Sequence, residues 1–208
     1  MNHQIRQSAF IALSAAAVFL SPCAAFGAVK VDVTEKPKLE DVMSPEFGGV
    51  RSKAFRAKNW LEIEVKIKIQ MKPEPKTKTC DKVTLKWYVA VENPEKSSTM
   101  LKLTKEIEYV NVPVGDDVFC NVYLSPASIK HLTGFDRSGK SAIKYAAFEV
   151  LIDGKVVAEA TDKGPPKWWS IQSDHIADST TVPLLNKMET PFAAVWWDRY
   201  PEIKGKTP

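Results

Sequence analysis

The side chains that could carry out catalysis are few in this sequence and show no catalytic spacing. The 208-residue chain holds three histidines, and His131 falls in a predicted short helix, where a surface or helix-capping role is the simplest interpretation. Ser173, Asp174 and His175 are consecutive, but neighbours in sequence do not make the spatial arrangement of a catalytic triad. No glycine-flanked serine, His-Glu-x-x-His motif or glycine-rich phosphate loop occurs. We therefore expect no catalytic residues, no metal site and no cofactor, in a protein that is not an enzyme.

Two glutamates are the remaining acid–base candidates. Glu62 and Glu64 lie two residues apart in an alternating segment, which places their side chains about 7 Å apart on one face of a strand. This separation suits the carboxylates of an inverting glycosidase. The same face also carries Lys66 and Lys68, and an alternating row of charges is typical of a strand face turned to water. We therefore expect a solvated, non-catalytic face.

Aromatic residues are the stronger candidates for function. Four of the six tryptophans lie in the last fifth of the chain, as the consecutive residues Trp168 and Trp169 and the consecutive residues Trp196 and Trp197. Exposed indole rings bind partner proteins or sugar rings, because they offer a large contact area at a low cost in side-chain entropy. The alternative is that the tail wraps the domain and that its tryptophans fill the space between tail and sheet. The four residues are therefore a candidate interaction surface, and the sequence leaves their burial open.

The amino terminus has the pattern of a secretory signal peptide. A polar start with Arg6 precedes an apolar run and a segment of small residues. Cleavage after Gly27 fits best, which predicts a mature chain exported to the periplasm, the outer membrane or the cell surface. Cleavage before Cys23, with lipidation, is the second option, although Pro22 departs from that pattern. A pilin-type leader is cut before its apolar run, and the order here is the reverse.

The distribution of charge argues against one class of partner, nucleic acid. Positive and negative side chains alternate along the predicted strands, although the formal net charge is +4, so nucleic acid is not an expected partner. We expect no membrane-spanning segment after removal of the leader.

Cys80 and Cys120 remain in the mature chain, and an even pair in an exported protein is a disulfide candidate. Two buried thiols are the alternative.

Apolar residues at every second position predict the fold. From Leu61 to Met71 each odd position is apolar, which indicates one face for a core and one for water. Prolines, glycines and polar residues separate this segment from similar ones. The predicted strands are Trp60–Met71, Lys82–Glu92, Met100–Val112, Val118–Leu124, Ser141–Ile152 and Lys155–Thr161, with Val50–Lys58 as a further short one.

Two local signals support this pattern. Ser125 and Pro126 fit the start of a short helix that ends at Gly134. Asp153 and Gly154, between two alternating segments, predict a tight hairpin. The sequence therefore predicts an all-β fold, an antiparallel immunoglobulin-like β-sandwich with one short helix and an aromatic-rich C-terminal tail. The expected organisation is a signal peptide at 1–27, an extended N-terminal arm at 28–49, the sandwich at 50–165 and the tail at 166–208. Within the arm, Val29–Val33 alternates briefly and is a candidate edge strand, or a candidate strand lent to a neighbouring molecule.

Several segments together carry a resemblance to a known family. After the leader they read WLEIEVKIKI, KWYVAVEN, NVPVGDDVFCNVYLSP, AAFEVLIDGKVVAEATDKGPPKWW and TPFAAVWWDRYP. The chain resembles exported immunoglobulin-like proteins of gut mucin-degrading bacteria that are encoded beside type IV pilus assembly genes. The resemblance implies a cell-envelope protein associated with the pilus machinery, with envelope or pilus proteins as partners and with possible self-association. It supplies no catalytic residues.

These observations lead to two main hypotheses. The first is a non-enzymatic structural or interaction protein of the cell envelope, associated with type IV pilus-like assembly or adhesion, in which edge strands and the aromatic tail make the contacts. The second is a carbohydrate-binding module that uses the tail tryptophans. A hydrolytic enzyme is third, since it would need a pair of carboxylates in a cleft. The position of the tail tryptophans in the folded chain decides where the site is.

Overall fold

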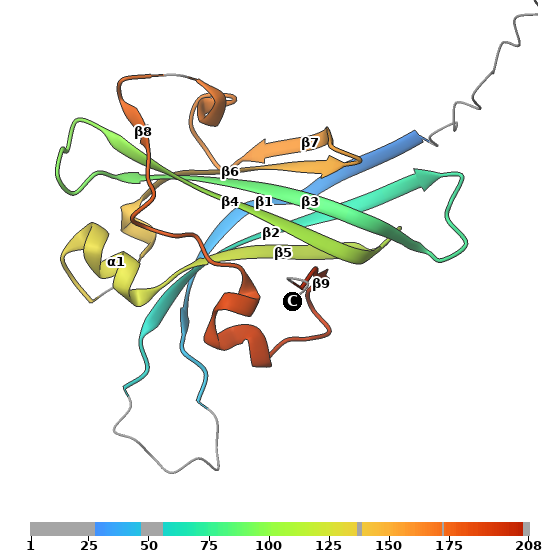
Figure 1. Ribbon diagram of the computed structural model, residues 1–208, viewed down its shortest axis with the longest axis horizontal. Helices are drawn as coiled ribbons and strands as arrows, with labels where there is room; N and C mark the ends of the chain where they lie inside the picture. The colour runs from blue at the N-terminus through green and yellow to red at the C-terminus, as the bar shows by residue number, and fades with distance from the viewer. Residues whose placement is uncertain (1–27, 47–55, 137–138, 172, 206–208) are drawn as a thin grey trace, which may run out of the picture.

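Two sheets packed face to face form the protein. The computed structural model describes residues 28–46, 56–136, 139–171 and 173–205 (Figure 1). Sheet A has the strand order β1-β2-β5, and sheet B has the order β7-β6-β3-β4-β8, with β9 also paired to β4. The described residues contain one α-helix, of eight residues. This arrangement confirms the predicted all-β sandwich.

The elements have the following bounds. The strands are β1 (Ala28–Met43), β2 (Asn59–Lys72), β3 (Thr79–Glu92), β4 (Met100–Pro113), β5 (Asp117–Leu124), β6 (Ile143–Ile152), β7 (Lys155–Thr161), β8 (Ile176–Asp178) and β9 (Glu202–Ile203). The helices are α1 (Pro126–Thr133) and the 3-10 turns η1 (Lys140–Ala142), η2 (Trp168–Ser170), η3 (Lys187–Glu189) and η4 (Pro191–Ala194). The six clearly predicted strands are therefore all present as β2 to β7.

The alternating segment predicted from the sequence is the central strand of sheet A. β2 pairs with β1 on one side and with β5 on the other, antiparallel in both cases. Its core-facing side chains are completely buried, namely Leu61, Ile63, Val65, Ile67 and Ile69. Each aliphatic side chain buried in this way contributes about 1.5–3 kcal/mol of hydrophobic stabilisation. The period-two pattern thus fixes which face of sheet A turns to sheet B.

The helix and the hairpin form where the sequence predicts them. The Ser125 hydroxyl accepts the backbone N–H of Ser128 at 3.1 Å, and Gly134 ends α1 with a φ of 75°. The loop between β6 and β7 has Asp153 at φ 51° and Gly154 at φ 73°. Two consecutive positive φ angles are the requirement of a type I′ turn, whose twist matches that of the two strands it joins.

The segment predicted as an extended N-terminal arm is a full strand of sheet A. β1 runs beside β2 from Ala28 to Met43, with register shifts between Val33 and Lys38. These irregularities, next to Pro37, interrupt the alternation that would have revealed a strand, and proline is tolerated because β1 is an edge. The predicted signal peptide and the Cys23 alternative lie outside the described residues, as does most of the predicted strand Val50–Lys58.

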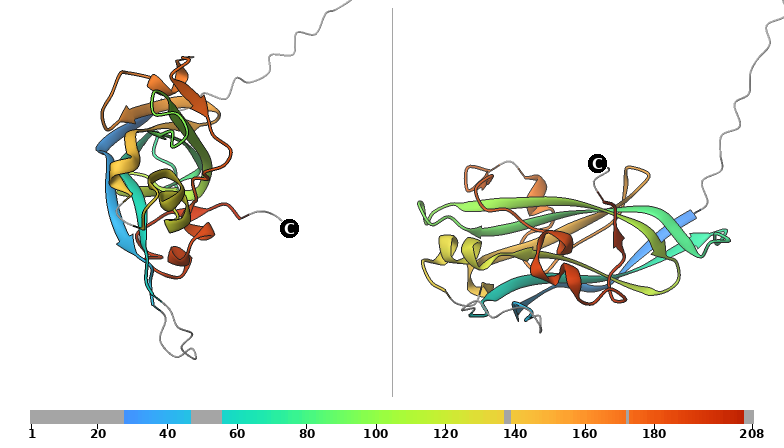
Figure 2. Two further views of the ribbon diagram at one scale, coloured as in Figure 1. Left: turned by 90° about the vertical axis from the view of Figure 1, so that its left-hand side faces the viewer. Right: turned by 60° about the horizontal axis from the view of Figure 1, so that its bottom comes forward.

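The C-terminal tail closes one side of the sandwich. β8 pairs with β4 at its start, and β9 returns to β4 near its end. Between them, Val182 and Leu184 enter the shared core, and Leu185 exchanges two backbone hydrogen bonds with Tyr123 of β5 at 2.8 and 2.9 Å. The tail therefore passes from sheet B to sheet A and back. Figure 2 (left) shows the red tail on one side of the sandwich and the blue β1 on the other.

Within the described residues, no helix is both long and apolar enough to cross a membrane.

Candidate interaction surface

The first tryptophan pair lies buried on the outer face of sheet B. Trp168 and Trp169 are 2% and 5% exposed and pack over Ala90 and Ala147. The ring of Trp169 stacks on Tyr88, with the ring centroids 5.8 Å apart and the planes 17° apart. The small alanine side chains leave room for the indole rings against the sheet. This half of the candidate surface is therefore covered, as in the alternative in which the tail packs against the sheet.

Both buried indoles also have polar partners. Trp169 Nε1 donates to Glu149 Oε1 at 2.9 Å, and Trp168 Nε1 donates to Thr161 Oγ1 at 3.2 Å. A buried indole N–H without an acceptor would be destabilising, so these bonds complete the site. Tyr88 donates to the same Glu149 carboxylate at 2.9 Å, and burial and this carboxylate raise the pKa of the Tyr88 hydroxyl above its ordinary value. The contacts are those of a structural anchor.

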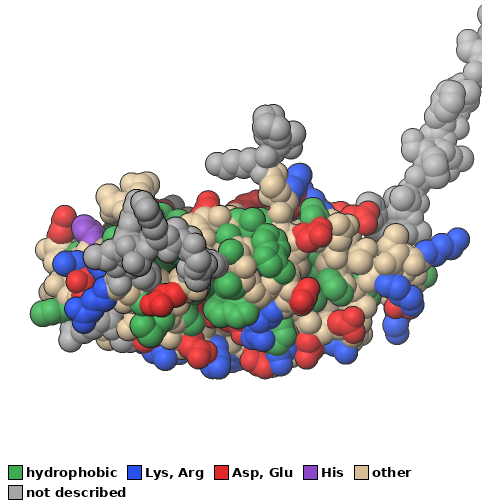
Figure 3. Space-filling model, turned by 90° about the horizontal axis from the view of Figure 1, so that it is seen from below, with side chains coloured by type: hydrophobic (Ala, Val, Ile, Leu, Met, Phe, Trp, Pro, Cys, Tyr) green, Lys and Arg blue, Asp and Glu red, His purple; other side chains and the backbone are tan. Residues whose placement is uncertain are grey.

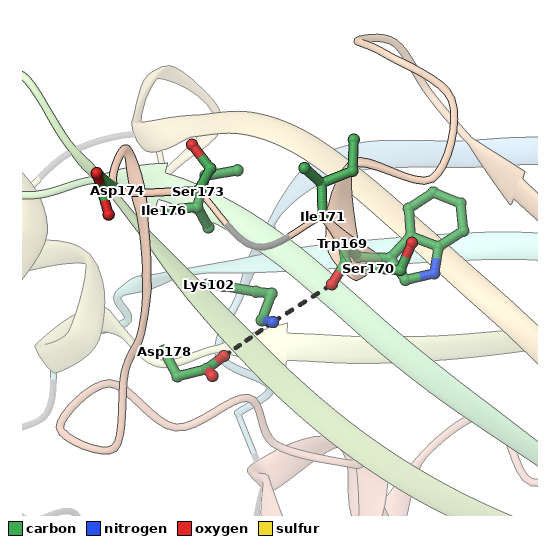
Figure 4. Close-up of a pocket in the computed structure, with 8 residues that line it drawn as sticks. All are labelled: Lys102, Trp169, Ser170, Ile171, Ser173, Asp174, Ile176 and Asp178. Atoms are coloured by element: carbon green, nitrogen blue, oxygen red, sulfur yellow. Dashed lines mark hydrogen bonds and ion pairs between the residues drawn. The ribbon is translucent and has the colours of Figure 1, made fainter.

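An open cleft of about 590 Å³ lies beside this anchor. Lys102 crosses it, with Nζ 3.3 Å from the carbonyl oxygen of Trp169 and 3.0 Å from Asp178 (Figure 4). Ser173 also lines the cleft, and its hydroxyl accepts the backbone N–H of His175 at 3.2 Å. The Ser173 hydroxyl is thus engaged in a local turn, and Lys102 fixes the tail to β4.

The second tryptophan pair is exposed. Trp196 is 46% exposed and Trp197 is 61% exposed, and Met188 in η3 is similarly open to solvent. We call these three residues the indole platform. Seen from below, hydrophobic side chains gather near the middle of the face that carries the tail (Figure 3). The indole platform is the part of the candidate surface that a partner can reach.

Internal contacts fix both exposed rings. Phe192 lies between Tyr123 and Trp196, stacked on each, at centroid distances of 5.0 and 5.5 Å. The Lys187 ammonium lies 4.8 Å from the ring centroid of Trp197. Each exposed indole therefore has a partner against one ring face, a cation–π contact in the second case. The rings are open to solvent but are held from beneath.

The backbone at the indole platform is strained. Trp196 has a φ of 57°, in the left-handed region that a bulky side chain rarely adopts and that costs about 1–2 kcal/mol. The N–H of Arg199 closes the turn by donating to the Trp196 carbonyl at 3.2 Å. Strained residues of this kind persist where the surrounding structure holds them, and they gather at functional sites.

The two glutamates on the outer face of β2 hold this turn to sheet A. Glu64 receives two hydrogen bonds from Arg199, at 2.7 and 3.2 Å. Tyr200 Oη lies 2.7 Å from Glu64 and 3.0 Å from Glu62. We call these four residues the carboxylate latch. The expectation of a solvated face is therefore wrong at this end of β2, because the tail covers Glu62 and leaves it only 7% exposed.

The buried carboxylate of Glu62 accepts three hydrogen bonds at one oxygen. Besides Tyr200, its Oε1 accepts from Asn121 Nδ2 and from Tyr123 Oη, both at 2.7 Å. Burial and the charge of Glu62 raise the pKa of both tyrosine hydroxyls above the ordinary value. The tyrosines therefore stay protonated and act as donors, which is how a carboxylate without a directly paired cation is accommodated here.

The two cysteines do not form the candidate disulfide in this structure. Both are free and buried, Cys80 at the start of β3 in sheet B and Cys120 in β5 in sheet A. Burial raises the pKa of each thiol, which keeps both protonated and of low reactivity. Among the described residues, no group of three or more metal-ligating side chains is found.

Sequence reasoning missed four residues of this surface. These are Lys187, Phe192, Arg199 and Tyr200, which surround the exposed tryptophans in the tail. The hydrogen-bond partners of Arg199 and Tyr200 lie 135 to 138 positions away along the chain, and Lys187 and Phe192 contact rings of other elements or other parts of the tail, so no local pattern could assign them. The only available signal was the concentration of aromatic and charged residues around Trp196 and Trp197.

Comparisons with known proteins place the chain in a family. A protein-family model matches residues 23–207. A search of curated proteins finds no match. Among solved structures, the chain is similar to a crystal structure of a protein from Akkermansia muciniphila, a gut mucin degrader, with 40% sequence identity and a TM-score of 0.81. The alignment covers 86% of this chain and 95% of that one. The chain therefore belongs to the family of β-sandwich proteins that includes this Akkermansia muciniphila protein.

Proposed function

We propose that the protein is a non-enzymatic interaction protein of the cell envelope, associated with type IV pilus-like assembly or adhesion. Its contact surface is the indole platform. The leader pattern of the sequence supports a place in the envelope, and the resemblance to proteins encoded beside pilus genes supports the association with that machinery. The family shared with a protein of a gut mucin degrader is consistent with both.

One observation carries this proposal, namely two large aromatic rings that are exposed and yet supported by a packed neighbour. Trp196 rests on Phe192, and Trp197 rests on Lys187. A ring held in place before binding loses little side-chain entropy when a partner covers it, and rigid tryptophans are the commonest anchors of protein interfaces. The strained backbone at Trp196 supports the same conclusion, because residues held in this conformation gather at functional sites.

A capture experiment with the mature chain tests the proposal. The chain is immobilised and exposed to envelope extract of the native organism, and bound pilus and envelope proteins are quantified by mass spectrometry. We expect the double variant W196A/W197A to capture at least about tenfold less of the specific partner than the wild type does. The reason is that an anchor residue contributes about 2 kcal/mol or more to the free energy of binding. Ile171→Ala is the matched control, since Ile171 is also exposed but lies elsewhere on the tail.

Two results would contradict the proposal. One is equal capture by the wild type and by W196A/W197A. The other is light scattering and capture that show only a monomer without partners. Cell fractionation with mass determination of the mature chain tests the export on which the proposal depends, since cleavage after Gly27 predicts an amino terminus at Ala28.

Carbohydrate binding is the second candidate, and one observation favours it. The indoles of Trp196 and Trp197 are supported from one side and open to solvent on the other, an arrangement that can stack against a sugar ring. A glycan array with mucin-type sugars tests this candidate. Absence of binding, or binding that survives Trp196→Ala and Trp197→Ala, eliminates it.

A further inference from the structure

A buried lysine without an acidic partner lies directly behind the indole platform. Lys187 is 4% exposed. Its ammonium lies 4.8 Å from the ring centroid of Trp197 and 5.6 Å from that of Tyr200. Within the described part of the chain, no ion pair or hydrogen bond of this ammonium is found. The nitrogen is not among the buried polar atoms that lack a hydrogen-bond partner, so the tip of this largely buried side chain still reaches solvent, beside ring faces that attract the cation.

Two neighbouring cations, unlike Lys187, are paired with carboxylates. Arg199 is paired with Glu64, and Lys105 is paired with Glu189 at 2.6 Å. For Lys187, burial lowers the pKa of the ammonium, and no carboxylate opposes that effect. The ammonium is partly desolvated and has no counter-ion among the described residues, which leaves a deficit in its solvation. A ligand that brought a carboxylate to this position would remove the deficit and gain affinity from it.

Apart from the exposed Asp198, the polar side chains near the indole platform are engaged in contacts within the protein. Asn186 and Glu189 form a reciprocal capping box at η3. The Thr190 hydroxyl donates to the Lys187 carbonyl at 2.7 Å and accepts the Phe192 N–H at 3.2 Å. Tyr200 is held by the carboxylate latch. A sugar site needs free polar side chains to meet the hydroxyl groups of its ligand, whereas apolar rings, a thioether and one unpaired cation suit an apolar peptide with one acidic group.

We propose that the indole platform and Lys187 together bind a peptide segment of a partner protein, with an apolar side chain on the tryptophans and a carboxylate beside Lys187. This inference rests on the proposed function and specifies the chemistry of the partner. Met188, flexible and 49% exposed, adapts to the apolar side chain. Asp198, exposed in the same turn, opposes an acidic ligand and so directs the carboxylate to the lysine side.

Matched peptides test this chemistry. The probes are Ac-Gly-Leu-Phe-Asp-Gly-NH₂ and the same peptide with Asn in place of Asp, titrated into the mature chain and followed by the indole N–H signals in NMR spectra. We expect the acidic peptide to bind about tenfold more tightly than the amide peptide, as for a hydrogen bond to a charged group. Lys187→Met should abolish this difference, and Lys187→Arg should keep most of it.

The variants also separate binding from folding. Lys187→Met has nearly the same length and keeps the buried stem of the side chain packed, so its melting temperature should change little. Asp198→Asn should strengthen binding of the acidic peptide and leave binding of the amide peptide unchanged. Equal affinities for the two peptides in the wild type, or an unchanged difference in Lys187→Met, would overturn the inference. Binding of glucuronic acid but of neither peptide would also overturn it and indicate an acidic sugar as ligand.

Failure of this inference and failure of the proposed function give different results. If W196A/W197A loses its envelope partner while the peptides do not depend on Lys187, the interaction surface stands and its acidic-peptide chemistry is wrong. If W196A/W197A captures the partner as well as the wild type does, the proposed function itself fails.

Discussion

The two tryptophan pairs of the tail have the same sequence and opposite roles. Trp168 and Trp169, edge to face with each other, pack against sheet B over alanines, with both indole N–H groups bonded to protein acceptors. Trp196 and Trp197 lie over sheet A and are open to solvent. The difference comes from what lies beneath them. Sheet B offers space at two small residues, whereas on sheet A the layer next to the strands is already filled by Phe192 and the carboxylate latch. Whether an aromatic pair is buried as an anchor or exposed as a contact surface thus depends on how much space is left by the side chains beneath it.

The largest expected effect separates the pairs by stability. Trp169→Ala removes a buried ring, its stack on Tyr88 and its bond to Glu149, so the free energy of unfolding should fall by about 3–5 kcal/mol. Urea unfolding followed by circular dichroism measures the change. A loss below about 1 kcal/mol would mean that the anchor does not stabilise the domain and that the comparison between the pairs is wrong.

A smaller effect is expected at the carboxylate latch, which supports the exposed pair. Tyr200→Phe removes one donor, but Glu62 keeps Asn121 and Tyr123, and Glu64 keeps Arg199. The free energy of unfolding should therefore fall by about 1–2 kcal/mol, and capture of the partner should weaken because the turn at Trp196 loosens. Glu159→Gln, at an exposed ion pair with Lys167, is the control and should change neither quantity measurably. Loss of stability without loss of capture would show that the latch does not position the platform.

The same latch predicts a dependence on alkaline pH. Tyrosines in the unfolded chain ionise near pH 10, whereas folded Tyr123 and Tyr200 keep their protons because their pKa values are raised. Above pH 10 the unfolded state therefore binds fewer protons than the folded state, and stability falls as pH rises. Urea unfolding between pH 8 and pH 11 measures the slope, which should be shallower in Tyr200→Phe. An identical slope in the two proteins would contradict the assignment.

The smallest effect on stability is expected at the outermost ring. Trp197→Ala removes a side chain that is 61% exposed, so the free energy of unfolding should change by less than about 1 kcal/mol. Partner capture should nevertheless be lost. Thermal unfolding and capture on the same sample test both halves of this prediction. A large destabilisation would show that Trp197 stabilises the fold, as the buried pair does, and would contradict the prediction.

Much of the fold could be predicted from local pattern. β2 to β7 appear because period-two alternation records the face that each strand buries, and the Asp153 turn forms because its two residues tolerate positive φ. β1 was predicted only over Val29–Val33, as a candidate edge strand, because its bulges and Pro37 hide the alternation beyond that point. β8 and β9, three and two residues long, are too short to have a period and form only because β4 offers them an edge.

The site was less predictable for a related reason. The sequence identified all four tail tryptophans but could not tell the buried pair from the exposed pair. Burial depends on the side chains beneath each pair, which are Ala90 and Ala147 of distant strands in one case and Phe192, packed on Tyr123 of β5, in the other. Glu62 shows the same limit. Its alternating charged neighbours are typical of a solvated face, and only the approach of Tyr200, 138 positions later, makes it buried.

The path of the tail also has a consequence for the order in which the chain folds. Val182 and Leu184 belong to the shared core, and β9 is formed by residues 202–203. A growing chain can form the hairpins β3–β4 and β6–β7 as they emerge, but it cannot seal the side between β4 and β5 until this late segment is available. The nascent sandwich therefore stays open along one side during synthesis, and loss of the segment after residue 181 would leave core surface permanently exposed to chaperones and proteases.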